Sequence, residues 1–294
     1  MAIDEAKLGK VLGEAVGEMG MRRPLTLVVG GSTLVLLVLV AARAWAAPPD
    51  AATIVRQMKQ ALEPAQSSLR KVTLSVRQDG DTATVQLGEA RGTGGDKNHI
   101  LVAVLAPAEL RGIAFLVKEE PAGPNDSTWT YLPAIRRVRS LVSSEAYSAF
   151  LNSDFTYSDL GFTSTRSSVS LLGEDTRDGV HVYRLSAVPV QNWYYSKIET
   201  TVAADTHLPI ERRYFDPAGA LWKVARWEHV AMINGIPTAL LVTMDDVQAK
   251  SSSTMTVTDL AYDAAVSPTL MEPRNMLSAA TSPVWTALQA PVGK

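Results

Sequence analysis

Three neighbouring stretches decide the fold: RGIAFLVKEEP at 111–121, WTYLPAIRRVR at 129–139 and AFLNSDFTYSDL at 149–160. The first two predict β-strands, and the second ends in a cluster of arginines. The third combines aromatic and acidic residues in a way that predicts a turn. No metal-binding or nucleotide-binding signature competes with them.

The same stretches resemble the central motif of the outer-membrane lipoprotein-sorting protein family, the LolA-like periplasmic carriers. In that family variants of LRG-AFLVKE, W-YLP-LRRVRR and SF-GSDF-YEDL recur. The resemblance covers about residues 50–275 and is most specific over 110–160. It implies an incomplete antiparallel β-barrel whose concave apolar face is lidded by helices and holds acyl chains. Two positions depart from the pattern, because Asn152 stands where Gly is usual and Ser158 where Glu is usual. A tight turn at the first position and an acidic role at the second are therefore not implied.

The N-terminus predicts export. Two arginines precede an apolar run at 25–42, and Ala-Trp-Ala follows at 44–46. This order is typical of a secretory signal peptide, here residues 1–46, cleaved after its last residue to release the protein into the periplasm. Translation from Met19 or Met21 would give a signal of ordinary length. The alternative is an uncleaved inner-membrane anchor, since about 18 apolar residues lie at the lower limit for a spanning helix.

Composition excludes several classes of protein. The chain has no cysteine, so it carries no lipidated cysteine and no disulfide, and its fold depends on the hydrophobic core. After removal of the five basic and four acidic residues of 1–46, 23 basic and 26 acidic residues remain. Such a balance provides no basic field for nucleic acid. We expect one monomeric domain over 47–277 and a flexible tail over 278–294.

Short strands separated by turn residues fill the mature chain. A helix is predicted at 50–62, where it ends before Pro64, and a hairpin turns at Asp79-Gly80 between strands near 72–76 and 83–87. Later strands are predicted at 169–172, 180–188, 194–202, 208–215, 221–230, 239–247 and 255–260, with 251–253 as a turn. The fold class is therefore mainly β with a few helices: one open or partly closed antiparallel barrel, strongly curved, with a helical lid.

Bulky residues on both faces of several strands suggest a cavity. Trp222 and Val224 alternate with Leu221, Ala225 and Trp227, so neither face of that strand is plainly polar. Ordinary core beneath helices such as 50–62 is one explanation, and a lipid cavity, which the resemblance implies, is the other. For Trp129 and Tyr131, aromatic core packing is equally open. The predicted lining is Leu74, Val76, Val85, Leu87, Phe115, Val117, Trp129, Tyr131, Trp222 and Val224.

The arginine cluster and the aromatic-acidic turn complete the candidate site. Arg136, Arg137 and Arg139 suit a lipid headgroup or an acidic partner, because guanidinium groups bind phosphate and carboxylate in a fork. The alternative is internal pairing with Asp154 and Asp159. In the predicted lid motif, Asp154 or Ser158 would cap a short helix. The motif consists of Phe150, Asp154, Phe155, Tyr157 and Asp159.

Enzymatic function is not expected. The four histidines are scattered, no nucleophile-elbow motif is present, and we expect no cofactor and no metal. The resemblance implies a carrier that moves lipid or lipoprotein acyl chains between the inner and outer membranes. Its partners would be an inner-membrane exporter of the ABC or RND/MMPL type and an outer-membrane acceptor. The alternative is a regulatory sensor of lipids or misfolded envelope proteins, of the type associated with anti-sigma factors.

Overall fold

The computed structural model places most of the predicted mature chain in one unit, Pro48–Lys294. The predicted signal peptide lies outside the described residues, so its cleavage stays a prediction. None of the helices in the described part is long and apolar enough to cross a membrane. The structure describes residues 49–93, 98–119, 127–141, 145, 147–160, 167–191, 193–289 and 291–292.

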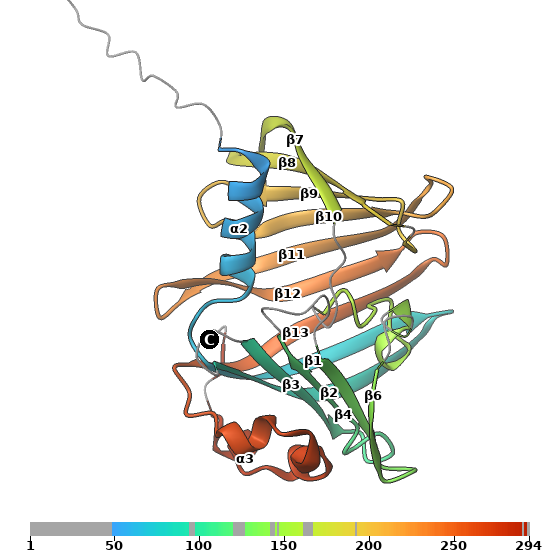
Figure 1. The fold of residues 1–294 in the computed structure, drawn as a ribbon, viewed down its shortest axis with the longest axis vertical. Helices are drawn as coiled ribbons and strands as arrows, with labels where there is room; N and C mark the ends of the chain where they lie inside the picture. The colour runs from blue at the N-terminus through green and yellow to red at the C-terminus, as the bar shows by residue number, and fades with distance from the viewer. Residues whose placement is uncertain are drawn as a thin grey trace, which may run out of the picture. The chain divides into compact units, whose positions relative to one another are not determined.

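Thirteen antiparallel strands form one sheet in the order β6-β5-β4-β3-β2-β1-β13-β12-β11-β10-β9-β8-β7 (Figure 1). Strands that follow one another in sequence pair with each other, except that β6 does not pair with β7, and β1 pairs with β13. The sheet is curved and not closed, with β6 and β7 at its edges, so the predicted fold class is confirmed. The strands are β1 Ser68–Gln78, β2 Asp81–Thr93, β3 Asn98–Ala106, β4 Ala114–Lys118, β5 Ser127–Leu132, β6 Arg137–Ser140, β7 Ser167–Arg177, β8 Val180–Pro189, β9 Lys197–Ala203, β10 Pro209–Phe215, β11 Leu221–Ile233, β12 Ile236–Asp246 and β13 Ser251–Tyr262.

Tight turns connect the hairpins where the sequence predicts them. Asp79 and Gly80 have φ of 53° and 91° between β1 and β2, the left-handed conformation that an Asp-Gly turn adopts readily. The predicted turn at 251–253 is wrong, because these serines begin β13 and the chain turns over 247–250 instead. The polar composition of this stretch was misleading, since Ser253 is fully buried and its hydroxyl donates a hydrogen bond to Asp154.

Helix α2, Ala51–Leu62, begins where predicted. The side chain of Asp50 accepts a hydrogen bond from the backbone N–H of Thr53 at 2.6 Å and caps the first turn. Ile54 is the buried residue of the helix, and it packs with Leu185 of β8 and Val202 of β9. The helix therefore lies against the β7–β9 part of the sheet (Figure 1).

The structure places residues 278–289, the first part of the predicted flexible tail, against the sheet. Two 3-10 helices, η3 Pro268–Met271 and η4 Pro273–Thr281, and the short α3 Val284–Ala287 pack on β1–β6. Trp285 is 4% exposed, and a Cβ on Gly88 of β2 would lie 2.7 Å from its ring. Gly88 therefore makes room for Trp285, a contact that composition does not reveal.

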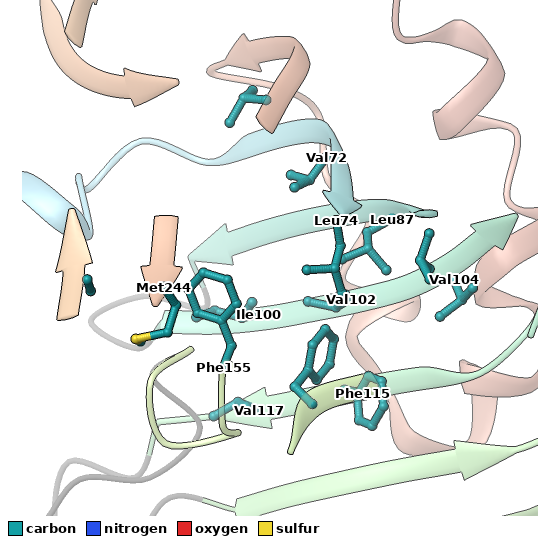
Figure 2. Packing of buried hydrophobic residues seen from close by; sticks show 14 of the residues in the cluster. Val72, Leu74, Leu87, Ile100, Val102, Val104, Phe115, Val117, Phe155 and Met244 are labelled. Carbon is teal, nitrogen blue, oxygen red and sulfur yellow. The ribbon is translucent and has the colours of Figure 1, made fainter. Parts of the chain in front are cut away.

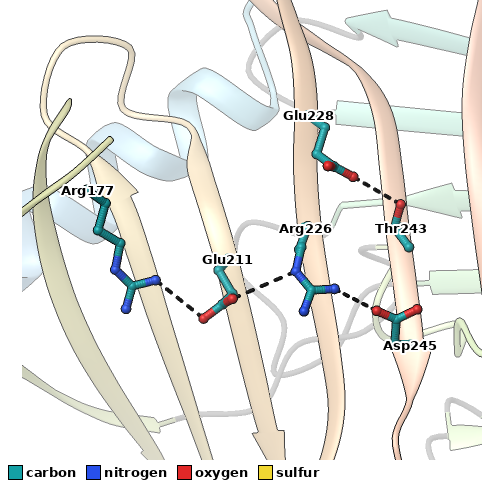
Figure 3. Close-up of polar contacts among 6 residues, drawn as sticks. All are labelled: Arg177, Glu211, Arg226, Glu228, Thr243 and Asp245. Atoms are coloured by element: carbon teal, nitrogen blue, oxygen red, sulfur yellow. Dashed lines mark hydrogen bonds and ion pairs between the residues drawn. The ribbon is translucent and has the colours of Figure 1, made fainter. Parts of the chain in front are cut away.

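The sheet has two faces, which we name by what lies on them. The inner face carries Leu74, Leu87 and Val102, and it is covered by α2 and by residues 147–160. The outer face of the β1–β6 half is covered by the C-terminal helices. The outer face of the other half is polar. There Arg177, Glu211, Arg226 and Asp245 form a row of ion pairs, and Thr243 donates a hydrogen bond to Glu228 (Figure 3).

Candidate functional site

A continuous apolar rung crosses the inner face. Trp227 of β11 lies opposite Val242 of β12, which lies opposite Met255 of β13. Met255 lies opposite Leu74 of β1, and Leu74 lies opposite Val85 of β2. The last two side chains are buried, whereas the first three are only half-buried. We call Trp227, Val242 and Met255 the apolar stripe.

Segment 147–160 covers the β1–β4 side of the inner face. It contains the 3-10 helix η2, Phe150–Asn152. The Phe150 ring lies 4.9 Å from the ring of Phe115 and 5.6 Å from that of Tyr157. Phe155 is 3% exposed and belongs to the same cluster (Figure 2). Three aromatic residues of the predicted lid motif are therefore core residues in this structure, and they shield the strands below.

Asp154 fixes this segment to the sheet. Its carboxylate accepts hydrogen bonds from the hydroxyls of Ser251 and, at 2.6 Å, Ser253, while its backbone N–H donates to the Ser253 hydroxyl at 2.9 Å. Lys223, which is 5% exposed, donates to the Asp154 carbonyl at 2.6 Å. The prediction that Asp154 caps a short helix is wrong, because its oxygens bind β13 instead.

The turn before Asp154 also needs unusual backbone geometry. Asn152 has φ of 59°, in the left-handed region. Glycine enters that region at no steric cost, and asparagine enters it more readily than most residues. Asn152 therefore adopts the left-handed backbone of a tight turn, although the family usually has Gly at this position.

Aromatic residues fasten the other end of the segment. Tyr195 donates a hydrogen bond to Asp159 at 3.3 Å, and the hydroxyls of Tyr194 and Thr156 lie 3.0 Å apart. Burial, reinforced by the charge of Asp159, raises the pKa of both tyrosines. Asp159 also accepts from Thr156 at 2.7 Å. The acidic residues of the motif thus hold the segment across the inner face.

The predicted pairing of the arginines with Asp154 and Asp159 is wrong. Arg139 forms an ion pair with Glu145 at 2.6 Å. Within the described residues, Arg136 and Arg137 form no ion pair, and both side chains are exposed. Arg136 has φ of 50° in the turn between β5 and β6, so it does not share a strand face with Val138 as a continuous strand would require. A role in headgroup or partner contact stays a prediction.

Most of the predicted lining lies on the inner face. Trp222 reaches that face through a bulge, since Tyr214 lies opposite Lys223 and Phe215 opposite Leu221, which leaves Trp222 as the extra residue. Its ring packs against Tyr194 and Tyr195. The inner-face members are Leu74, Val76, Val85, Leu87, Phe115, Val117 and Trp222.

Three residues of the predicted lining are misplaced. Trp129 and Tyr131 pack in the outer-face cluster under the C-terminal helices, so core packing, the alternative reading of this pair, is correct. Val224 lies opposite Asp245 and Arg213, which places it on the outer face. The reason for the last error is the bulge at Trp222, which breaks simple alternation along β11.

Two cavities border the inner face. The larger, about 620 Å³, lies between α2 and β7. The smaller, about 60 Å³, lies beneath segment 147–160. The larger is lined by Ala52, Val55, Arg56, Lys59, Gln60, Glu63, Ser167 and Val169. The smaller is lined by Val72, Leu87, Glu89, Arg91, Ile100, Val102, Phe150, Leu160 and Met255.

The charged pair in the smaller cavity is absent from the predicted site. Glu89 and Arg91 continue the alternation of Val85 and Leu87 along β2, so all four side chains point to the inner face. Extending the alternation of β2 from Leu87 to residues 89 and 91 would have placed both side chains on the inner face. The signal in the sequence is that two charged residues occupy the alternate positions of β2 whose earlier members, Val85 and Leu87, are buried.

Solved structures with this fold define the class of the protein. A DUF1329 family protein from Desulfovibrio piger gives a TM-score of 0.70 at 24% identity, over 76% of this chain and 96% of that chain. A putative outer membrane lipoprotein-sorting protein domain from Vibrio parahaemolyticus gives 0.68 at 22% identity, over 76% and 97%. A LolA superfamily protein from Nitrosomonas europaea gives 0.61 at 18% identity, over 76% and 98%. The fold is therefore LolA-like, and the predicted resemblance is confirmed.

The sequence itself places the chain in a family. The model of a family described as "Uncharacterized protein" matches residues 96–278, and the chain belongs to this family. No match was found among curated proteins.

Proposed function

We propose that the protein is a periplasmic carrier that binds acyl chains of a lipid or lipoprotein along its inner face. The apolar stripe carries this proposal. A sheet face that serves only as core should be closed over its apolar side chains, whereas Trp227, Val242 and Met255 are left half-buried between α2 and segment 147–160. An acyl chain would complete their burial.

The energetics favour such a ligand. Each CH₂ group removed from water contributes about 0.8 kcal/mol, so a single long acyl chain offsets a large entropic cost of binding. The outer face offers no equivalent surface in the described residues, because one half is covered by the C-terminal helices and the other carries ion pairs (Figure 3). The inner face is thus the favoured binding surface.

The setting of the carrier follows from its resemblance and its N-terminus. A lipoprotein-sorting protein domain has the same fold, which supports a ligand that carries acyl chains. We propose an inner-membrane exporter of the ABC or RND/MMPL type as donor, an outer-membrane acceptor, and no enzymatic step. The mature protein would begin near Ala47. N-terminal sequencing of protein from the periplasmic fraction tests this, and recovery only from membranes with residues 25–42 intact would contradict it.

A matched pair of variants tests the binding surface. Val85, Leu87 and Val117 are poor probes, because each is at most 5% exposed and a charge there would unfold the protein. Val242 is half-buried on the inner face, and Val230 of β11 is 47% exposed outside the inner-face cluster. We expect Val242→Asp to weaken binding of a fluorescent fatty-acyl probe at least tenfold, about 1.4 kcal/mol.

The control decides the interpretation. Val230→Asp should bind the probe like the wild type, and both variants should melt within a few degrees of it. Equal affinity in the two variants would reject the stripe as the binding surface. Native mass spectrometry of protein purified from its own periplasm would then identify any lipid that co-purifies.

A further inference from the structure

Four polar side chains interrupt the apolar inner face at one end of β1 and β2. Ser68 lies opposite Arg91, and Arg70 lies opposite Glu89. All four point to the same side as Val72, which follows them in the alternation along β1. Ser68 is 1% exposed and Arg91 is 7% exposed. Polar groups this deeply buried normally have hydrogen-bond partners, so the partners of each decide what the cluster does.

Two of the three guanidinium nitrogens of Arg91 lack such partners. Its Nε and Nη1 atoms are buried without a hydrogen-bond acceptor, and so is the hydroxyl of Ser68. Glu89 forms an ion pair with Arg70, whose Nε lies 3.3 Å from one carboxylate oxygen, although that Nε is itself buried without a hydrogen bond. A buried guanidinium that has lost water and gained no acceptor destabilises the fold, so this arrangement is costly as it stands.

The charged residues around Arg91 leave its guanidinium group positively charged. Arg70 and Arg91 place two cations beside the single carboxylate of Glu89, and Glu63 acts on Arg91 through its field. Burial lowers the pKa of Arg91, and the charge of Glu89 opposes that shift. A guanidinium nonetheless keeps its proton throughout the physiological range. Arg91 lines the cavity, so its positive charge lies beside it, together with the carboxylate of Glu89.

The cavity gives this charge an apolar surround. Among the described residues that line it, Arg91 and Glu89 are the charged ones, and the other seven are apolar. Met255 lines the cavity and also belongs to the apolar stripe, so the charged end and the stripe adjoin. Its volume of about 60 Å³ accommodates a small head group and no acyl chain.

We propose that Arg91, together with the Ser68 hydroxyl, binds the anionic head of an acyl ligand whose chain extends toward Met255. The ligand class is an acyl chain that carries one anionic group, a carboxylate or a phosphate. This inference rests on the proposed acyl-binding function and narrows it, because a neutral acyl group would leave Arg91 without an acceptor. Its energetic basis is a charge-assisted hydrogen bond in a site from which water is excluded.

Three probes of equal chain length test the proposal on the mature protein: palmitic acid, methyl palmitate and 1-palmitoyl-glycerol 3-phosphate. We expect the wild type to bind at least one of the two anions tenfold or more tightly than the ester. The stronger anion identifies the head group as carboxylate or phosphate. Arg91→Met, which keeps the length of the side chain and removes its charge, should abolish the preference for the anions over the ester. Arg226→Met, on the outer face, should keep the wild-type preference.

The possible outcomes distinguish the proposed role of Arg91 from the proposed acyl-binding function. Binding of the ester and both anions with equal affinity would reject the role of Arg91 and keep the acyl-binding function. Failure of all three to bind would reject both. If Arg91→Met does not fold, the wild type with palmitate labelled at its carboxyl carbon gives the answer by NMR. The pKa of the bound carboxyl should lie below that of the free acid, and a raised pKa would overturn the proposal.

Discussion

Replacing Asp154 by alanine should release segment 147–160 from the inner face. The side chain of Asp154 is bonded to the hydroxyls of Ser251 and Ser253, and the residue itself is 9% exposed. Hydrogen bonds to a charged group contribute about 1.5–3 kcal/mol each. The backbone bonds from Asp154 to Ser253 and from Lys223 to Asp154 survive the change, so part of the loss is recovered. We expect a net loss of about 3 kcal/mol in the free energy of unfolding.

Urea denaturation followed by tryptophan fluorescence measures this loss. For a domain of this size, 3 kcal/mol corresponds to a decrease in Tm of about 6–12 °C. The matched control is Asp245→Ala on the outer face. Asp245 pairs with Arg226 at 2.6 Å and accepts a hydrogen bond from Ser252 at 2.7 Å, but the side chains of Asp245 and Arg226 are 33% and 42% exposed (Figure 3). Exposed pairs contribute about 0–1 kcal/mol and a hydrogen bond about 0.5–1.5 kcal/mol, so this variant should lose clearly less stability than Asp154→Ala.

A double-mutant cycle isolates the contact itself. Asp154→Ala and Ser253→Ala combined should cost less than the sum of the two single variants, because each removes the same hydrogen bond. The reasoning would be refuted if Asp154→Ala and Asp245→Ala cost the same small amount, or if the cycle were additive. Packing of Phe150 and Phe155 alone would then hold the segment (Figure 2).

Three further predictions concern other parts of the fold. Trp285→Ala should lower the free energy of unfolding, measured by chemical denaturation, by about 3–5 kcal/mol, because the buried ring that packs on Gly88 is removed. If the tail is flexible instead, the substitution should leave the free energy of unfolding unchanged. Arg137→Ala should leave the Tm unchanged and lower transfer of cargo to acceptor membranes if this exposed residue contacts a headgroup or partner; unchanged transfer would remove it from the site. The contribution of Tyr194 and Tyr195 to stability should be constant up to about pH 10 and fall above it, since their raised pKa means that the folded state binds more protons there than the unfolded state. Ultraviolet difference spectra should show these tyrosines ionising only together with unfolding, and their free titration near pH 10 would contradict the burial of both rings.

Much of the strand pattern was predictable because it depends on local properties. Asp79-Gly80 and Asn234-Gly235 adopt positive φ and turn the chain, and both hairpins lie where the sequence indicates. The start of β9 at Lys197 was not predictable in this way. Tyr194 and Tyr195 have the apolar character of strand residues, but their rings pack edge-on against Trp222 on the inner face before the strand begins.

The candidate site was predicted only in part, for two physical reasons. Alternation assigns Leu74, Val85 and Leu87 to one face correctly, because the side-chain period of a regular strand is two. A single bulged residue inverts that assignment, which is why Val224 was placed on the wrong face. Arg91 was overlooked because its charge suggested solvent, and only the packing of the strand around it makes it buried.

The sequence by itself determined the local structure: the capped helix at Asp50, the Asp-Gly and Asn-Gly turns, and the apolar phase of each regular strand. These features depend on dihedral preferences and on neighbours a few residues apart. Tertiary structure alone decided the pairing of β1 with β13, the bonds from Asp154 to serines about a hundred residues away, and the burial of Arg91 beside Met255. Contacts between distant segments depend on strand order and register across the whole sheet, and no short stretch of the chain encodes these.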